Sequence, residues 1–199
     1  MKIFIANTGV GNVYSLLTAL RRLGSEAYIS LSRDKLEEAD GIILPGVGNF
    51  ESAVKRLEKI REYLIDKVKS GTPLLGICLG YQLLFEESEE GAGRGLSIFK
   101  GKVVRLPNTV KVPHMGWNTL EKIRPSPITE GIEEGSYVYF VHSYYPKPAE
   151  PIVIAETYYG VWFPSIAGRN GVYGVQFHPE RSGNVGFRIL SNFLKVIKR

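Results

Sequence analysis

The sequence contains a single cysteine, Cys78, which lies between two glycines in the segment GICLG, residues 76–80. An apolar run ends at Ile77, and helix-like spacing begins just after the cysteine. This pattern is the thiol counterpart of the G-x-S-x-G elbow, which exposes a nucleophile between a strand and a helix. The positive end of a helix dipole favours the thiolate, and the backbone N–H of Leu79 could hold an oxyanion. Free cysteines are usually inert and buried, but the two glycines at this junction favour a nucleophile.

A cysteine nucleophile requires a base, and one of the three histidines is followed closely by a carboxylate. His178 precedes Glu180 by two residues in the segment QFHPE. The residue before a proline is extended, and side chains two apart in an extended chain project to the same side. We therefore predict that Glu180 orients His178 while the imidazole takes the proton of Cys78. His114 and His142 lie in apolar, strand-like segments, where a structural role fits as well as a site role.

The elements that must position these residues alternate between strand and helix in the first half of the chain. Continuous apolar runs predict buried strands, and apolar residues at helical spacing predict amphipathic helices. Asn49 is a suitable N-cap for the longest helix. This β-α-β alternation predicts an open parallel sheet with helices on both sides, in which ligands bind at the carboxyl ends of the strands. Strands are predicted at 2–6, 26–30, 41–45 and 72–77, and helices at 11–24, 49–70 and 79–88.

The second half of the chain has a different texture. Short segments rich in Val, Tyr, Phe and Ile lie between Gly, Pro and Asn residues, which predicts antiparallel strands added to the sheet or near it. We find no linker, repeat or low-complexity tract, so residues 1–199 are expected to form one α/β domain with a flavodoxin-like core. The predicted strands lie at 101–107, 136–145, 151–159 and 171–179, and a final helix lies at 184–199.

Two glycine-containing loops are candidate ligand sites. The segment LPGVGNF, 44–50, follows a strand, and its glycines leave the backbone around Val47 free to offer an N–H as a second oxyanion donor beside Leu79. A tight strand-to-helix turn is the alternative. The segment TGVGNVY, 8–14, has Tyr14 where the third glycine of G-x-G-x-x-G belongs, which argues against a dinucleotide site.

Composition narrows the class of protein. The chain is 44% hydrophobic and 23% charged, as is typical of soluble globular proteins. Its net charge of +5 is dispersed among acidic residues, so we expect a solvated surface and no nucleic-acid site. One cysteine cannot form an internal disulfide, and no apolar run approaches the ~20 residues of a membrane span, so a cytoplasmic protein is expected. With one cysteine and three scattered histidines, we expect no metal site and no cofactor.

Several motifs in this order resemble those of the class I, or triad-type, glutamine amidotransferases. GICLG with a distant HPE is shared by many amidotransferases. PGVGNF and PHMGWN are narrower, and they are similar to the glutaminase subunits of imidazole glycerol phosphate synthases. The motifs are PGVGNF (45–50), GICLGYQLLFEES (76–88), PHMGWN (113–118), YFVHSYY (139–145) and GVQFHPERS (174–182).

The resemblance implies a role for each matching residue. The catalytic three are the nucleophile Cys78, the base His178 and the orienting carboxylate Glu180. The oxyanion hole falls on Val47, Gly48 and Leu79. The glutamine-binding positions are Gln82, His142, Ser143 and Tyr144. The partner-facing positions are Asn12 and Trp117, although an ordinary core aromatic is the alternative for the tryptophan.

The resemblance also implies a substrate and a partner. Similar enzymes hydrolyse L-glutamine and pass ammonia to a (β/α)₈ cyclase subunit, which forms imidazole glycerol phosphate and an aminoimidazole carboxamide ribotide. A chain of 199 residues is too short to contain such a barrel, which usually needs ~250 residues, so a heterodimer is expected. Two alternatives stay open: the glutaminase subunit of a pyridoxal phosphate or anthranilate synthase, and a nonenzymatic flavodoxin-like domain with Cys78 as a redox sensor.

Overall fold

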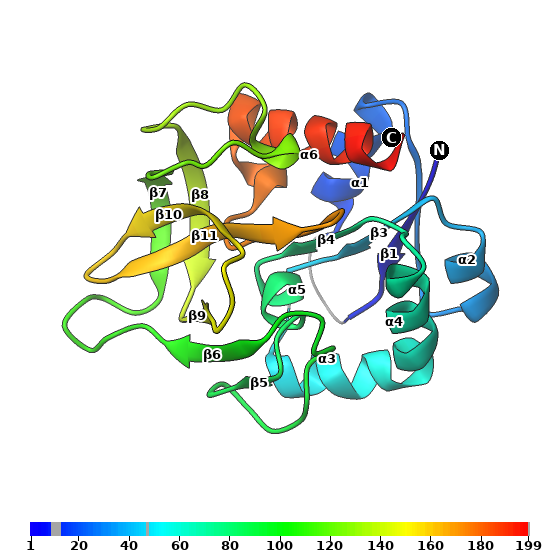
Figure 1. The fold of residues 1–199 in the computed structure, drawn as a ribbon, viewed down its shortest axis with the longest axis horizontal. Coiled ribbons are helices and arrows are strands. Elements are labelled where there is room, and N and C mark those ends of the chain that lie inside the picture. The colour runs from blue at the N-terminus through cyan, green and yellow to red at the C-terminus, as the bar shows by residue number, and fades with distance from the viewer. Residues whose placement is uncertain (9–12, 47, 199) are drawn as a thin grey trace.

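A twisted, mostly parallel sheet forms the centre of the protein (Figure 1). The computed structural model describes residues 1–8, 13–46 and 48–198, and in these residues the sheet has seven strands in the order β10-β11-β12-β4-β3-β1-β2. The adjacent strands β2, β1, β3, β4 and β12 run parallel to one another. Strands β11 and β10 extend the sheet beyond β12 through antiparallel pairs. The predicted α/β class is thus confirmed. The strands are β1 Lys2–Ala6, β2 Glu26–Ser30, β3 Gly41–Leu44, β4 Leu74–Ile77, β10 Val153–Tyr158, β11 Trp162–Arg169 and β12 Val172–Val175.

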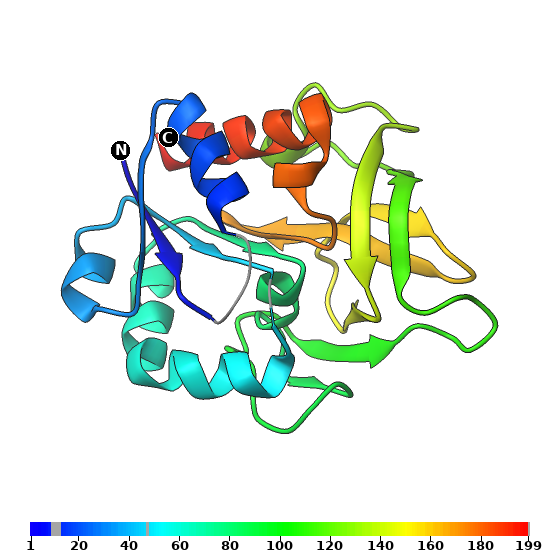
Figure 2. The ribbon, with the colours of Figure 1, turned by 180° about the vertical axis from the view of Figure 1, so that it is seen from behind.

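Helices cover both faces of this sheet because successive apolar side chains of each strand point to opposite sides. Ile3 and Ile5 share one core with α1 and α6, whereas Phe4 shares the other core with α3 and α4. Figure 2, seen from behind, shows these two helix layers on either side of the strands. The helices are α1 Tyr14–Arg22, α2 Arg33–Glu37, α3 Phe50–Leu57, α4 Arg61–Lys69, α5 Leu79–Gln82 and α6 Gly183–Ile197.

The prediction of one long helix over 49–70 is wrong. A 3₁₀ turn, η1 (Glu58–Ile60), separates α3 from α4, and the backbone of Ile60 leaves helical geometry at φ −127° and ψ 6°. Leu57, Ile60 and Leu64 are all buried, so the apolar stripe continues unbroken through the change of direction and periodicity alone does not reveal it. The predicted cap is confirmed, because the Asn49 side chain accepts a hydrogen bond from the Ser52 N–H at 3.0 Å.

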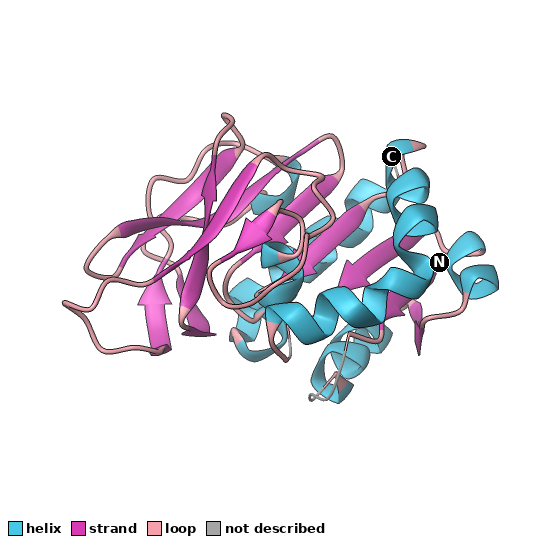
Figure 3. Cartoon of the chain, turned by 90° about the horizontal axis from the view of Figure 1, so that it is seen from below, coloured by secondary structure: helices cyan, strands magenta, loops and turns pink. Residues whose placement is uncertain are grey.

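The second half of the chain contributes the remaining strands. Figure 3 shows that the end of the molecule away from the two termini is built mainly of strands. The predicted strand 136–145 is divided at Ser143, since β8 pairs with β7 while β9 pairs with β6. The described chain has two further sheets. One contains β5 Glu87–Ser88, β6 Gly101–Arg105 and β9 Tyr144–Pro148, and the other contains β7 His114–Thr119 and β8 Tyr137–His142.

The segment 171–179 is predicted to be antiparallel, and this holds for only one of its two neighbours. Strand β12 is antiparallel to β11 but parallel to β4, with Gly174 opposite Gly76. Because β4 and β12 run side by side in the same direction, the residues that follow them emerge at the same edge of the sheet. In the parts of the chain that the structure describes, no helix is long and apolar enough to cross a membrane.

Candidate active site

Cys78 occupies the sharp turn that the sequence predicts. It directly follows β4, and its backbone has φ 48° and ψ −104°, in a region that residues other than glycine rarely adopt. Holding such a conformation costs on the order of 1–3 kcal/mol and is found mainly at functional sites. The backbone N–H of Cys78 donates to the carbonyl of Val175 at 2.7 Å, which ties the turn to the end of β12.

Both flanking glycines are required by close backbone contacts at this turn. A Cβ at Gly76 would lie 2.6 Å from the carbonyl oxygen of Gly80 and 2.7 Å from the Cα of Tyr81. A Cβ at Gly80 would overlap the carbonyl oxygen of Leu44 at the end of β3. The glycines therefore let the turn fit against its neighbouring strand.

We expect Gly80→Ala to destabilise the fold by about 3 kcal/mol or more, because the added methyl group meets rigid backbone. Denaturant unfolding of the two proteins measures the difference. Gly24→Ala is the matched control, since no atom lies within 4 Å of its added methyl group and only its φ of +77° opposes the change. The control should lose about 1 kcal/mol, as expected for a left-handed backbone. Equal losses would contradict the steric argument.

The helix after the cysteine is shorter than predicted. A helix does begin at Leu79, directly after β4 and Cys78, but this helix, α5, ends at Gln82 instead of continuing to residue 88. After α5 the backbone turns with 3₁₀-type hydrogen bonds, in which Leu84 N–H donates to Tyr81 O and Phe85 N–H donates to Gln82 O, both at 3.1 Å. The side chains of Leu84 and Phe85 are buried. A single turn aligns few peptide dipoles, so the expected dipole stabilisation of the thiolate is weak.

The histidine and its carboxylate lie beyond the end of β12. His178 is buried, and its Nδ1 lies 2.8 Å from Oε1 of Glu180, which belongs to the 3₁₀ turn η3 (Pro179–Arg181). Burial alone would lower the pKa of His178, but the neighbouring Cys78 and Glu180 outweigh it and raise the pKa to about 10. With Nδ1 held by Glu180, Nε2 is the nitrogen that is left to exchange a proton with the neighbouring Cys78.

A cavity of about 280 Å³ lies over the sulfur and collects most of the predicted ligand-binding positions. Two of the three predicted oxyanion-hole residues, Gly48 and Leu79, line this cavity. The third, Val47, lies outside the described residues. Every predicted glutamine-binding position lines it as well: Gln82, His142, Ser143 and Tyr144.

His142 uses both ring nitrogens inside the protein. Burial lowers the pKa of His142 to about 3 and that of His114 to about 4, so both rings are neutral. Nδ1 of His142 donates to the carbonyl of Tyr144 at 2.9 Å, so its Nε2 accepts from Nδ1 of His114 at 3.1 Å. Nε2 of His114 then accepts from the Asn118 amide at 3.3 Å. A direct contact of His142 with glutamine stays a prediction, and a positioning role fits these bonds.

Sequence reasoning missed Gln176. Its Nε2 lies 3.4 Å from Sγ of Cys78, and the residue is fully buried. A signal was available in its position two residues before His178, although the backbone bends at 176–177 after β12 ends at Val175. The sulfur also lies 3.7 Å from the carbonyl oxygen of Val141.

Trp117 is not a core aromatic. Its side chain is 54% exposed on β7, and its ring packs edge-on against Tyr139 with a centroid distance of 5.9 Å. Met115 on the same strand and Tyr137 on β8 are also exposed. These residues form an exposed aromatic surface on the β7–β8 pair. The other predicted partner residue, Asn12, lies outside the described residues.

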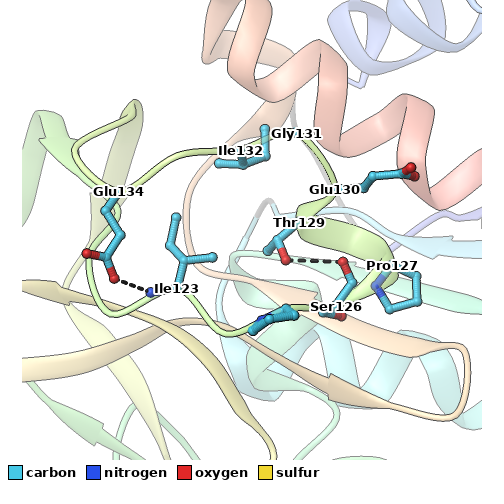
Figure 4. Close-up of a pocket in the computed structure, with 9 residues that line it drawn as sticks. Ile123, Ser126, Pro127, Thr129, Glu130, Gly131, Ile132 and Glu134 are labelled. Atoms are coloured by element: carbon cyan, nitrogen blue, oxygen red, sulfur yellow. Dashed lines mark hydrogen bonds between the residues drawn. The ribbon is translucent and has the colours of Figure 1, made fainter.

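A larger hollow of about 560 Å³ lies on the loop around the 3₁₀ turn η2 (Pro127–Thr129), away from the cysteine (Figure 4). Its polar groups bond to one another: Glu134 accepts from the Ile123 N–H at 2.8 Å, and Thr129 Oγ1 donates to the Ser126 carbonyl at 3.2 Å. It is lined by hydroxyl and carboxylate side chains but by no cysteine or histidine, so we place the candidate site at Cys78.

Comparison with known proteins defines the class. Residues 4–197 match the family described as glutamine amidotransferase class-I. Among solved structures, a putative GMP synthase protein from Thermoplasma acidophilum has a TM-score of 0.78 at 22% identity, over 100% of this chain and 94% of that one. A glutamine amidotransferase from Thermotoga maritima has a TM-score of 0.74 at 15% identity, over 100% and 99% of the two chains. The fold and the family match together define a class I glutamine amidotransferase.

More similar relatives identify the narrower family. The imidazole glycerol phosphate synthase subunit HisH of Geobacillus kaustophilus is 50% identical, over 96% of this chain and 95% of the relative. The subunit HisH of Archaeoglobus fulgidus is 49% identical over 99% and 100%, and that of Methanopyrus kandleri is 48% identical over 100% of both. This chain therefore belongs to the HisH family of imidazole glycerol phosphate synthase subunits, which confirms the resemblance inferred from the motifs.

Proposed function

We propose that this chain is the glutaminase subunit of an imidazole glycerol phosphate synthase, acting in histidine biosynthesis through the residues at Cys78. One observation carries the assignment of the site: the thiol and the His178–Glu180 pair emerge side by side from parallel strands, next to a cavity lined by polar backbone and amide groups. We take residues 1–199 as one amidotransferase domain, located in the cytoplasm.

The proposed reaction uses the histidine to move one proton in each half. His178 takes the proton of the Cys78 thiol, the thiolate attacks the side-chain amide carbon of glutamine, and the amide oxygen becomes an oxyanion. His178 delivers its proton to the departing ammonia as the C–N bond breaks, which leaves a glutamyl thioester. Water then gives a proton to His178 and attacks the thioester, which releases glutamate and restores the thiol. Glu180 holds Nδ1, so Nε2 faces the reacting atoms throughout.

The cavity supplies the remaining contacts in this proposal. The N–H of Leu79 and an N–H of the loop at Val47 and Gly48 stabilise the oxyanion. Gln82, Ser143 and Tyr144 hold the amino-acid end of glutamine, and His142 keeps the strand beneath them in place.

Ammonia passes in this proposal to a separate (β/α)₈ cyclase subunit bound as a heterodimer. There it combines with a phosphoribulosyl-formimino aminoimidazole carboxamide nucleotide. The relatives' names describe them as synthase subunits, which supports a partner for this chain. The exposed aromatic surface on the β7–β8 pair, with Trp117 at 54% exposure, is the proposed contact, since large aromatic side chains anchor interfaces.

The experiment combines the purified chain with the cyclase subunit of the same organism and follows formation of imidazole glycerol phosphate. We expect product from glutamine only when both subunits are present, and product from ammonium salts with the cyclase subunit alone. Stable binding to a pyridoxal phosphate or anthranilate synthase partner, with no glutamine-dependent imidazole product, would sink the proposal.

Trp117→Ala is expected to raise the Kd of the heterodimer at least about tenfold, because a central aromatic anchor contributes about 2 kcal/mol or more at many interfaces. Calorimetric titration with the cyclase subunit measures this change. The chain offers a matched control in its other tryptophan, Trp162, which is 42% exposed on β11 and lies over Lys122. Trp162→Ala should leave Kd unchanged, and equal effects of the two substitutions would contradict the placement of the interface.

A further inference from the structure

Gln176 is the one buried side-chain amide that reaches the sulfur of Cys78 among the described residues. Its Nε2 lies 3.4 Å from Sγ, within hydrogen-bonding range for sulfur, and its side chain is 0% exposed. The backbone N–H of Gln176 donates to the carbonyl of Ser165 at 2.9 Å, so the neighbouring strand β11 holds its main chain. A buried donor held in this way has no competing contact with bulk water.

The direction of the hydrogen bond between Gln176 and Cys78 is fixed by the carbonyl of Tyr144, through the amide of Gln82. The carbonyl oxygen of Tyr144 can only accept, so the group of Gln82 that lies 2.9 Å from it must be the Nε2 donor. The second hydrogen of the same Nε2 is donated to Oε1 of Gln176 at 3.3 Å. The Gln176 amide must therefore present Nε2, its donor, to Cys78.

The contacts of the sulfur with Val141 and Gln176 respond in opposite ways to ionisation. A thiol donates its hydrogen to the carbonyl of Val141, 3.7 Å away, and also accepts from Gln176. A thiolate has no hydrogen to donate and loses the first bond, whereas the bond from Gln176 strengthens because the acceptor is charged. A hydrogen bond made to the charged form of a group favours that form.

We propose that Gln176 is a further catalytic residue, whose side-chain N–H donates to Cys78 Sγ and stabilises the thiolate that attacks glutamine. This inference rests on the proposed role of Cys78 as the nucleophile. The one-turn helix α5 supplies little dipole stabilisation, so a side-chain donor fills the role that a longer helix would have had. Gln82 holds the donor in orientation, which links the nucleophile to the glutamine pocket.

Other titratable groups lie around Cys78. His142 from β8 and Glu90 from the loop after β5 line the cavity, and the Glu90 carboxylate accepts from the Phe50 N–H. The His178–Glu180 pair acts on Cys78 from outside the cavity lining. None of them is altered in the variants below. Differences between variants therefore report on Gln176.

The test measures alkylation of the full chain by iodoacetamide as a function of pH, using intact mass. Cys78 is the only cysteine, so one added carboxamidomethyl group reports on this thiolate alone. Gln176→Met keeps the length of the side chain and removes the donor. We expect alkylation at pH 7 to slow roughly tenfold or more, as for loss of a hydrogen bond to a charged acceptor.

Ser165→Ala is the control, because its buried Oγ has no partner in the described structure and its backbone bond to Gln176 is retained. It should reproduce the wild-type profile. Should Gln176→Met not fold, Gln176→Asn, one methylene too short, carries the same expectation. A wild-type profile in a folded Gln176 variant, even with a lower Tm, would show a purely structural role and overturn the inference. Alkylation does not require glutamine turnover, so this result is independent of the proposed glutaminase activity.

Discussion

Cys78→Ala is expected to abolish glutamine hydrolysis, with kcat reduced by about 10⁶ as for loss of a nucleophile from a comparable triad. Without the sulfur no thioester forms, and the remaining groups cannot replace covalent catalysis. The measurement is glutamate release by the chain in complex with the cyclase subunit, with the nucleotide substrate of the cyclase present. The substitution removes only one sulfur at a turn whose backbone is fixed by Gly76 and Gly80, so we expect Tm to change little.

The same complex supplies the control for this prediction. If the chain only delivers ammonia, the complex that carries Cys78→Ala should still form imidazole glycerol phosphate from ammonium salts at the wild-type rate. Loss of glutamine-dependent product together with loss of binding to the cyclase subunit would indicate a damaged interface instead of a missing nucleophile. Glutaminase activity within about tenfold of wild type would show that Cys78 is not the nucleophile.

Local sequence rules were sufficient for the elements that carry the three proposed catalytic residues. The run LLGI is apolar throughout because β4 is covered on both faces, and the glycines on either side of Cys78 mark the tight turn. His178 and Glu180 also make the predicted contact, 2.8 Å between Nδ1 and Oε1, although Glu180 lies in the 3₁₀ turn η3 and not in the extended backbone that the prediction assumed. These features depend on neighbours in the sequence, and so they can be read from it.

Features that depend on distant packing could not be predicted in the same way. The apolar stripe continues through Ile60 although the helix does not, and the helix after Cys78 stops at Gln82 although helical spacing continues. The parallel pairing of β12 with β4 joins segments that lie far apart in the sequence, and nothing local to either strand specifies it. That pairing is nevertheless what brings the two halves of the proposed site together.

Gln176 shows an intermediate case. Its position just after β12 brings it to the same sheet edge as Cys78, but only the Gln82 and Tyr144 contacts determine which end of its amide meets the sulfur. The same holds for His142, whose ring nitrogens are assigned by Tyr144 and His114. Sequence patterns can thus bring polar residues to a site, whereas the hydrogen-bond directions follow from the assembled structure.

Glu180→Gln is expected to lower kcat by about 10⁴ in the complex, as when the triad carboxylate of a serine protease is replaced by its amide. The amide keeps the shape of the side chain but no longer carries the charge that pairs with an imidazolium. It can also present its NH₂ to Nδ1 and reverse the tautomer, which would leave Nε2 protonated when a base is required. Glutamate release by the variant, compared with Glu156→Gln on β10 as a charge-matched control away from the site, measures the effect.

The sign of the accompanying pKa change follows from the contacts of His178. Burial lowers the pKa of the ring, while Cys78 and Glu180 raise it, with a net pKa of about 10. Removing the carboxylate removes one of the raising contributions, so the NMR titration midpoint of His178 should move to lower pH in Glu180→Gln. Comparing both proteins in a Cys78→Ala background removes the coupled thiol, so the difference isolates Glu180. An unchanged midpoint together with unchanged kcat would mean that the carboxylate neither charges nor orients the ring, and His178 would then need another partner for its role.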